Sequence, residues 1–335
     1  GWILKFESFF LLLPAVTGLL YQELQDGLIY ALVALFCFIL GHVLTIMGSK
    51  DGQLYVREGF VSVSLGWTIM SILGALPFVL TGDIPNFTDA LFETISGLTT
   101  TGASILNDVE ALSHANLFWR SFTHWIGGMG VFVLVMAILP MMGGTTMNLM
   151  KAESPGPSVG KFVPRVKDTA KILYSIYLFI TVAQIIVLLI CRMPLFDALT
   201  TTFGTVGTGG FGIMNDSITG YSPAIQNTIT IFMILSGINY TAYFCIISKQ
   251  FLSAFKLEEV RAYLLIILAA IIIICANTFQ LYESFGETLR HTAFQVSSII
   301  TTTGFSTTDF NLWPQLSKTV LVILMFVGAC AGSTG

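Results

Sequence analysis

The sequence predicts an all-α integral membrane protein, and three observations support this fold class. First, 54% of the 335 residues are hydrophobic and only 10% are charged, whereas soluble domains carry about 25% charged residues. Second, apolar runs of about twenty residues recur, and a helix of that length crosses ~30 Å of hydrocarbon. Third, these runs lack the period-two alternation of barrel strands, so the chain is expected to cross the bilayer as helices.

Eight apolar segments are predicted as membrane spans, the last of them short. They cover residues 2–21, 27–47, 58–80, 117–142, 169–191, 224–248, 260–279 and 314–330. If the N-terminus is cytoplasmic and each segment crosses once, eleven of the fifteen Lys and Arg face the cytoplasm. The positive-inside rule favours this orientation. The chain starts inside an apolar segment and shows no signal-peptide cleavage site.

Cysteines and histidines show no spacing typical of metal sites or of a disulfide framework. All five cysteines lie within apolar runs and are expected to be core residues: Cys37, Cys191, Cys245, Cys275 and Cys330. His42 lies within the second segment. The other histidines are expected in structural roles at the outer starts of helices: His114, His124 and His291. No serine, histidine and carboxylate cluster predicts hydrolysis, so the chain is not expected to be an enzyme.

Three external connections each contain a second, shorter apolar stretch: FTDALFETISGL, PLFDALTTTFGTV and TLRHTAFQVSSII. These stretches are too short to cross a bilayer but have the length of re-entrant half-helices. Each leads into a run rich in threonine and glycine: TTTGAS, GTGGFG and TTTGFS. Ordinary external loops also favour Thr, Gly and Ser, but three such runs at matching positions favour a common role.

The three stretches align when Gly102, Gly210 and Gly304 are superposed. The superposition pairs Thr100 with Thr208 and Thr302, Asp89 with Asp197 and His291, and Phe92 with Thr200 and Phe294. The match is moderate within each segment and strong in order and spacing. Helix, half-helix and helix, repeated about every hundred residues, is the signature of an internal repeat.

The chemistry of the runs predicts cation binding by backbone carbonyls. A half-helix entering from outside directs its partially negative C-terminal end toward the membrane centre. Carbonyl oxygens in the run behind it can replace the hydration shell of a large monovalent cation, and glycine permits the torsions this requires. The runs contain no charged residue, which favours carbonyl dipoles over a ring of carboxylates.

On the motifs ISGLTTTGAS, FGTVGTGGFG, SSIITTTGFSTTDF, HWIGGMGVFVLVMAILP and GACAGSTG, the chain resembles the Trk/Ktr/HKT potassium transporter superfamily, in its bacterial TrkH branch. The resemblance covers essentially the whole chain. It implies tandem helix–pore loop–helix units in a pseudo-fourfold arrangement around a central pore, with two extra N-terminal helices. The implied parts are the leading helices (1–50), the first unit (51–145), the second unit (146–252) and the third unit (253–335). A fourth unit is absent, so the chain is expected to be incomplete at its C-terminus.

The resemblance also implies a selectivity filter for K⁺ and an intramembrane gate loop. The filter residues would be Thr100, Thr101, Gly102, Thr208, Gly209, Gly210, Thr302, Thr303 and Gly304. Because Gly209 and Gly210 are adjacent, either could align, and the phenylalanine that follows favours Gly210. The gate loop would be Gly328, Ala329, Cys330, Ala331, Gly332, Ser333, Thr334 and Gly335. The alternative for Gly328 and Gly332 is close helix packing by a GxxxG pair.

The function that the resemblance implies is potassium uptake across the cytoplasmic membrane, with K⁺ as the transported ion and no bound cofactor. The alternative is a secondary transporter whose re-entrant hairpins bind a small solute or a sodium-coupled substrate near the midplane. Expected partners are the lipid bilayer, a second copy of the chain and a cytosolic ring of nucleotide-binding regulatory subunits (TrkA-like). Residues 151–171 are a candidate contact for that ring. No nucleic-acid partner is expected.

Overall fold

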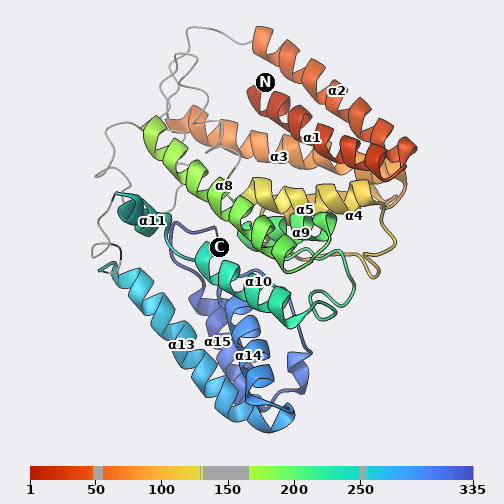
Figure 1. The fold of residues 1–335 in the computed structure, drawn as a ribbon. Coiled ribbons are helices and arrows are strands. Elements are labelled where there is room, and N and C mark those ends of the chain that lie inside the picture. Colours follow the sequence, from red (N-terminus) through yellow and green to blue (C-terminus); the bar gives the residue numbers. More distant parts are fainter. Residues whose placement is uncertain (48–55, 129, 131–165, 249–253, 255, 335) are drawn as a thin grey trace. The chain divides into compact units, whose positions relative to one another are not determined.

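The computed structural model describes the whole chain except residues 48–55, 129, 131–165, 249–253, 255 and 335. The described parts are helical and contain no strand (Figure 1). The chain forms two compact units. One comprises Gly1–Thr99 and Ala103–Tyr174, and the other comprises Thr100–Gly102 and Ser175–Gly335.

In the first unit, α1 (Trp2–Leu20) and α2 (Leu24–Met47) form a tight hairpin (Figure 1). The two helices approach closely where Gly18 faces Gly27, because a Cβ on Gly18 would lie 2.9 Å from the Gly27 nitrogen. Small residues permit such approaches between membrane helices, where close van der Waals contact is a main source of packing energy.

The first helix–loop–helix unit packs against this hairpin. It consists of α3 (Val56–Thr81), α4 (Phe87–Leu98) and α5 (His114–Gly128). Asn116 of α5 accepts from the Tyr30 hydroxyl at 2.6 Å and donates to Asp83 at 2.7 Å. Of the predicted span 117–142, the structure describes residues 117–128 and Gly130. Since α5 begins at His114, His124 lies inside the helix, and the prediction that it starts a helix is wrong.

A buried ion pair joins the two helices of this loop. The Arg120 Nε lies 2.5 Å from Glu93 Oε1, and the two side chains are 3% and 0% exposed. The Glu93 carboxylate also accepts from the Ser104 hydroxyl at 2.9 Å and from the Ile105 amide at 3.2 Å. A buried carboxylate needs this full set of partners to offset its desolvation. Glu93 thereby fixes the chain directly after Gly102 to both α4 and α5.

In the second compact unit, which comprises Thr100–Gly102 and Ser175–Gly335, a segment predicted as one span is broken into two helices. The predicted span 224–248 consists of α10 (Pro223–Ser236) and α11 (Tyr240–Ile247), which meet at 90°. At the break, Gly237 lies against the Tyr263 hydroxyl and the Thr301 side chain, so a larger residue would have to displace one of them. Asn239 starts α11 by accepting from the Thr241 amide at 2.8 Å. Hydropathy is continuous across this break, which is why the sequence did not predict it.

The remaining helices of the second unit agree with their predicted ranges to within a few residues. They are the end of α8 (Val166–Ile190), α9 (Leu195–Val206), α13 (Glu258–Thr278), α14 (Phe285–Ile300) and α15 (Gln315–Val327), with the short 3₁₀ turns η3 (Phe279–Leu281) and η4 (Phe310–Leu312). His291 lies inside α14, so the prediction that it starts a helix is also wrong.

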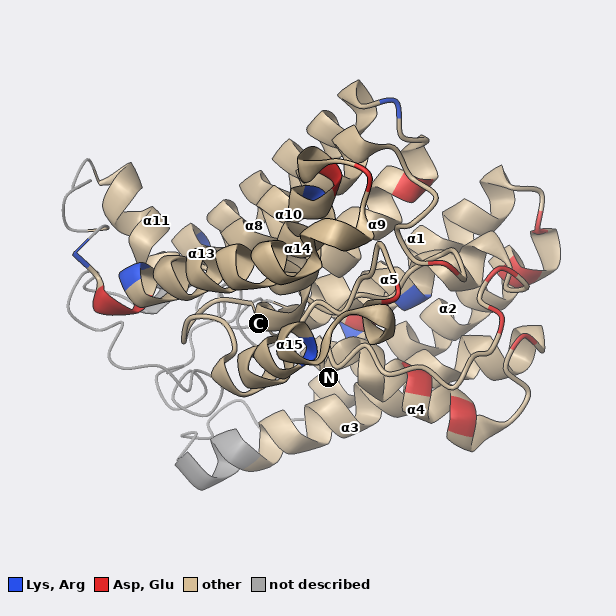
Figure 2. Ribbon diagram, turned by 90° about the horizontal axis from the view of Figure 1, so that it is seen from below, with Lys and Arg blue, Asp and Glu red and all other residues tan. Residues whose placement is uncertain are grey.

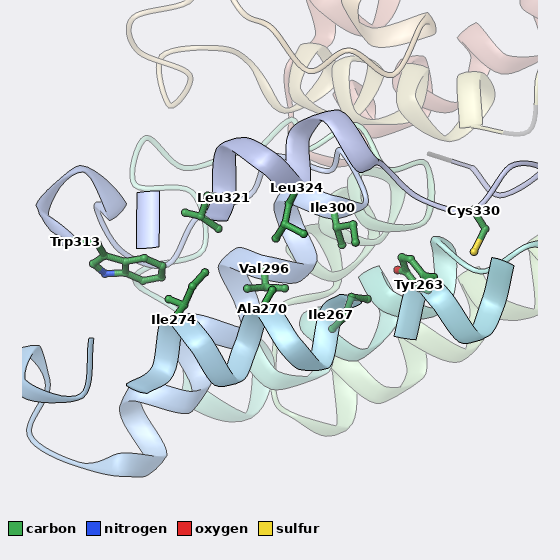
Figure 3. Close-up of a cluster of buried hydrophobic side chains, with 10 residues drawn as sticks. All are labelled: Tyr263, Ile267, Ala270, Ile274, Val296, Ile300, Trp313, Leu321, Leu324 and Cys330. Atoms are coloured by element: carbon green, nitrogen blue, oxygen red, sulfur yellow. The ribbon is translucent and has the colours of Figure 1, made fainter. Parts of the chain in front are cut away.

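An apolar core holds α13, α14 and α15 together (Figure 3). Ile267 and Ile274 of α13 face Val296 of α14 and Leu321 of α15 (Figure 3). Trp313, which precedes α15, closes one end of this cluster and donates its indole N–H to the Tyr282 hydroxyl at 2.9 Å. The third helix–loop–helix unit is thus packed as one body.

The surface confirms a membrane protein. Within the described residues, five helices are long and apolar enough to cross a bilayer, and the bent pair α10–α11 passes the same test as a broken span. Large apolar side chains such as Phe179 and Phe326 are 74% and 89% exposed, and lipid would cover them. Most charged residues lie at helix ends and in connections (Figure 2).

The buried pair gives a stability prediction. Arg120→Ala leaves the Glu93 carboxylate buried without its cation, and breaking such a pair costs about 3–5 kcal/mol of unfolding free energy. We expect a clear drop in the thermal midpoint of the detergent-solubilised protein. Arg261→Ala is the control, because Arg261 is exposed and forms no ion pair with the described residues. Equal midpoints for the two variants would contradict the structural role of the pair.

Candidate functional site

The three threonine- and glycine-rich runs share one local architecture. The short helices before them, α4, α9 and α14, end at Leu98, Val206 and Ile300. Each of these residues stands four positions before the aligned glycine. The structure therefore gives the runs the alignment that the sequence predicted, with Gly210 as the counterpart in the second run.

The backbone conformation also repeats three times. Thr100, Thr208 and Thr302 have φ angles of 55°, 54° and 58°. The glycines two residues later are also left-handed, with φ angles of 73°, 75° and 87° in the same order. A threonine in this region is strained, at a cost of about 1–3 kcal/mol, and such strain persists only where the surroundings impose it. Its recurrence at one aligned position makes the three runs the candidate functional site.

In the second and third runs, backbone amides donate hydrogen bonds to carbonyl oxygens near the end of the preceding short helix. The Gly209 amide donates to Gly204 O at 2.9 Å, and the Gly304 amide donates to Ser298 O at 3.3 Å. The Thr302 hydroxyl donates to the preceding carbonyl at 2.7 Å, and the Thr208 hydroxyl oxygen lies 2.8 Å from the Gly207 carbonyl oxygen.

This arrangement leaves carbonyl oxygens without donors. In the part of the chain that the structure describes, no group donates a hydrogen bond to the carbonyl oxygens of Gly209 and Thr303. Both residues are buried. Because a buried carbonyl needs a partner, these oxygens are open to a cation or to water.

The three runs meet within one compact unit, since Thr100–Gly102 belongs to the same unit as the other two. Gly102 lies directly against the Gly209 carbonyl oxygen, and Gly210 lies directly against that of Thr303. A Cβ on Gly102 would also come within 4.0 Å of the Thr303 oxygen. The Thr303 oxygen is therefore close to both other runs, and no side chain fits at Gly102 or Gly210 without displacing a carbonyl.

The phenylalanines next to two of the runs are buried. Phe211 and Phe305, which follow the aligned glycines, are 2% and 1% exposed. The Phe305 ring packs on Gly204 of α9, where a Cβ would lie 2.9 Å from the ring. Ser298 donates to the Phe305 carbonyl at 2.6 Å. Sequence reasoning missed Gly204 and Ser298, although the repeated Gly-Phe pair was a visible signal.

Asp197 and His291, which share one aligned position in α9 and α14, each contact the loop that follows their helix. The Tyr221 hydroxyl donates to Asp197 Oδ2 at 2.9 Å, and His291 Nδ1 lies 2.9 Å from the Thr307 hydroxyl. His291 therefore has a structural role, as the sequence predicted. Among the described residues, no group of His, Cys, Asp and Glu could hold a metal ion.

The segment Gly328–Thr334, which we call the GACAGST segment, is not helical, and Gly335 lies outside the described residues. Gly328 and Gly332 have φ angles of 70° and 78°. No atom lies within 4 Å of a Cβ placed on Gly328, which argues against a tight GxxxG contact there. Thr208 donates its hydroxyl to the Thr334 carbonyl at 2.8 Å, so the segment touches the second run directly.

Comparison with known proteins agrees with this architecture. The family model of TrkH, described as a cation transport protein, matches residues 30–335. The Trk system potassium uptake protein TrkH of Salmonella typhimurium is 38% identical over 334 residues, which cover 97% of this chain and 68% of the relative. TrkG of Escherichia coli is 33% identical over all of this chain and 70% of its own length.

A solved structure shows the same fold. The crystal structure of the potassium transporter TrkH from Vibrio parahaemolyticus superposes with a TM-score of 0.85 at 33% identity, covering 100% of this chain and 70% of that one. The chain belongs to the TrkH family of cation transport proteins.

Proposed function

We propose that this chain takes up K⁺ through a channel-like pore in the cell membrane. One observation supports this most strongly: three left-handed Thr-x-Gly runs meet with the carbonyl oxygens of Gly209 and Thr303 between them. Several relatives are potassium uptake proteins by name. The role is transport and not catalysis.

In this proposal, backbone oxygens replace the water around the ion. The selectivity filter consists of Thr100, Thr101, Gly102, Thr208, Gly209, Gly210, Thr302, Thr303 and Gly304. Carbonyl groups held in place by the helix ends exchange for hydration water without a charged side chain, so the ion binds and still leaves. The membrane potential drives entry with about 2.3 kcal/mol per charge for each 100 mV.

The GACAGST segment is the proposed gate. Its glycines permit a backbone that changes direction without a helix, and its contact with Thr208 supports this role. Residue 335, which completes the gate loop expected from the sequence, lies outside the described residues.

We further propose a cytoplasmic membrane location with the N-terminus in the cytoplasm, in line with the positive-inside rule. The relatives' name "Trk system" supports a multi-component assembly, in which a dimer of this chain binds a cytosolic ring of nucleotide-binding subunits. The candidate contact at 151–171 lies for the most part outside the described residues.

Glycine substitutions test the filter. Gly102→Ala and Gly210→Ala each place a methyl group against a carbonyl oxygen of a neighbouring run, whereas Gly304→Ala meets open space and adds only the left-handed strain. That strain alone is about 1–2 kcal/mol. We expect the K⁺/Na⁺ flux ratio in proteoliposomes to fall about tenfold or more in the first two variants, and less in Gly304→Ala. Wild-type ratios in all three would remove these runs as the filter.

Ion binding also gives a stability prediction. A ligand that binds only the folded state stabilises it, by about 2.7 kcal/mol at a hundred times its Kd. We expect K⁺ or Rb⁺ to raise the thermal midpoint of the solubilised protein above its value in Li⁺ at equal ionic strength. Gly210→Ala should lose this difference. A midpoint that is the same in all three salts would argue against carbonyl coordination.

A further inference from the structure

We propose that Asn239, at the break between α10 and α11, is a latch that holds the GACAGST segment in the non-conducting position. This inference rests on the proposed gate role of that segment. Asn239 is a positioning residue, since it acts on the segment and not on the ion.

The broken helix needs partners for the carbonyls at its end. An α-helix leaves its last carbonyls without helical donors, and water cannot satisfy them inside a bilayer. Here the Tyr263 hydroxyl donates to Ile234 O at 3.1 Å, and the Tyr243 hydroxyl donates to Leu235 O at 2.6 Å. Tyrosine side chains from α13 and α11 thus supply donors for two of the carbonyls at the end of α10.

The GACAGST segment supplies donors for the next two carbonyls along the chain, those of Ser236 and Gly237. Thr334 donates its hydroxyl to Ser236 O at 3.1 Å, and the Cys330 amide donates to Gly237 O at 3.1 Å. In return, the Tyr240 amide donates to Gly332 O at 3.1 Å. The break and the segment therefore complete each other, and displacing the segment leaves both with unpaired backbone groups.

One side chain joins this contact to a third element. Asn239 Nδ2 donates to Ala331 O at 2.7 Å and to Glu259 Oε2 at 3.2 Å, while Oδ1 accepts from the Thr241 amide at 2.8 Å. A carboxamide supplies both the acceptor for the helix cap and the donors for the other two contacts. Glu259 stands in the first turn of α13 and is exposed.

The position of Asn239 suits a releasable contact. The other hydrogen bonds around it either lie within the buried break or join backbone groups, whereas the bonds from Nδ2 are exposed. Gly328, where the segment starts, is surrounded by open space on its side-chain face, since a Cβ there would meet no atom within 4 Å. Opening the Asn239–Ala331 bond therefore removes one of the contacts that hold the segment and lowers the free energy needed for it to turn about Gly328.

Asn239→Asp separates the latch from the helix cap. Aspartate caps a helix as well as asparagine does, but its carboxylate cannot donate to Ala331 O and it repels Glu259. We expect the basal K⁺ flux of the purified full-length protein in liposomes to rise about fivefold, the factor that corresponds to one lost hydrogen bond. The K⁺/Na⁺ ratio should stay at its wild-type value, because the filter is unchanged.

Matched variants test whether loss of the Asn239 amide donor, without added charge repulsion, raises the flux. Asn239→Asp combined with Glu259→Gln removes the added repulsion and should still raise the flux, though less than Asn239→Asp alone. Asn239→Ser also caps the helix without an amide donor and should give the same direction if the aspartate variant folds poorly. Asn86→Asp is the control, since Asn86 also caps a helix, through the Thr88 amide, and its flux should not change.

The outcomes separate the latch from the proposed function. If the wild type conducts K⁺ and both Asn239 variants show wild-type or lower basal flux, the latch is wrong while the pore stands. If neither the wild type nor the Asn239 variants pass any K⁺, the proposed function itself fails, and the latch fails with it. A raised flux with a collapsed K⁺/Na⁺ ratio would also overturn the latch, because it would indicate a damaged filter.

Discussion

The need to satisfy every backbone polar group inside a bilayer governs this structure. Water cannot serve the backbone in hydrocarbon, so non-helical chain persists only where protein or an aqueous path shields it. At the second and third Thr-x-Gly runs, backbone amides bond back to the helix ends while the oxygens of Gly209 and Thr303 receive no donor from the described residues. In the proposed pore, those oxygens would bind a dehydrated cation.

Contacts from neighbouring elements explain how backbone strain is tolerated in the runs. A left-handed threonine is costly in isolation, yet it recurs at Thr100, Thr208 and Thr302. Rigid support from behind offsets the cost: Phe305 packs on Gly204, and the Glu93–Arg120 pair fixes the chain after Gly102. These contacts come from different elements, so the runs are shaped by their surroundings and not by their own preferences.

The break between α10 and α11 follows this principle at a second place. It leaves helix-end carbonyls that tyrosine hydroxyls and the GACAGST segment satisfy between them. A non-helical segment in one helix–loop–helix unit is thereby paired with a helix break in the preceding one. Because the segment also accepts the hydroxyl of Thr208, any movement of it changes the environment of both the break and the second run.

The sequence by itself determined the membrane class, most of the spans, and the three short helices ending four residues before an aligned glycine. These features depend on hydropathy and on glycine chemistry, which are local. Tertiary structure decided what distant residues do: the 90° break, the Glu93–Arg120 pair, the packing of Phe305 on Gly204 and the bond from Asn239 to Ala331. The sequence could not show them, because each depends on contacts between segments that only the folded chain brings together.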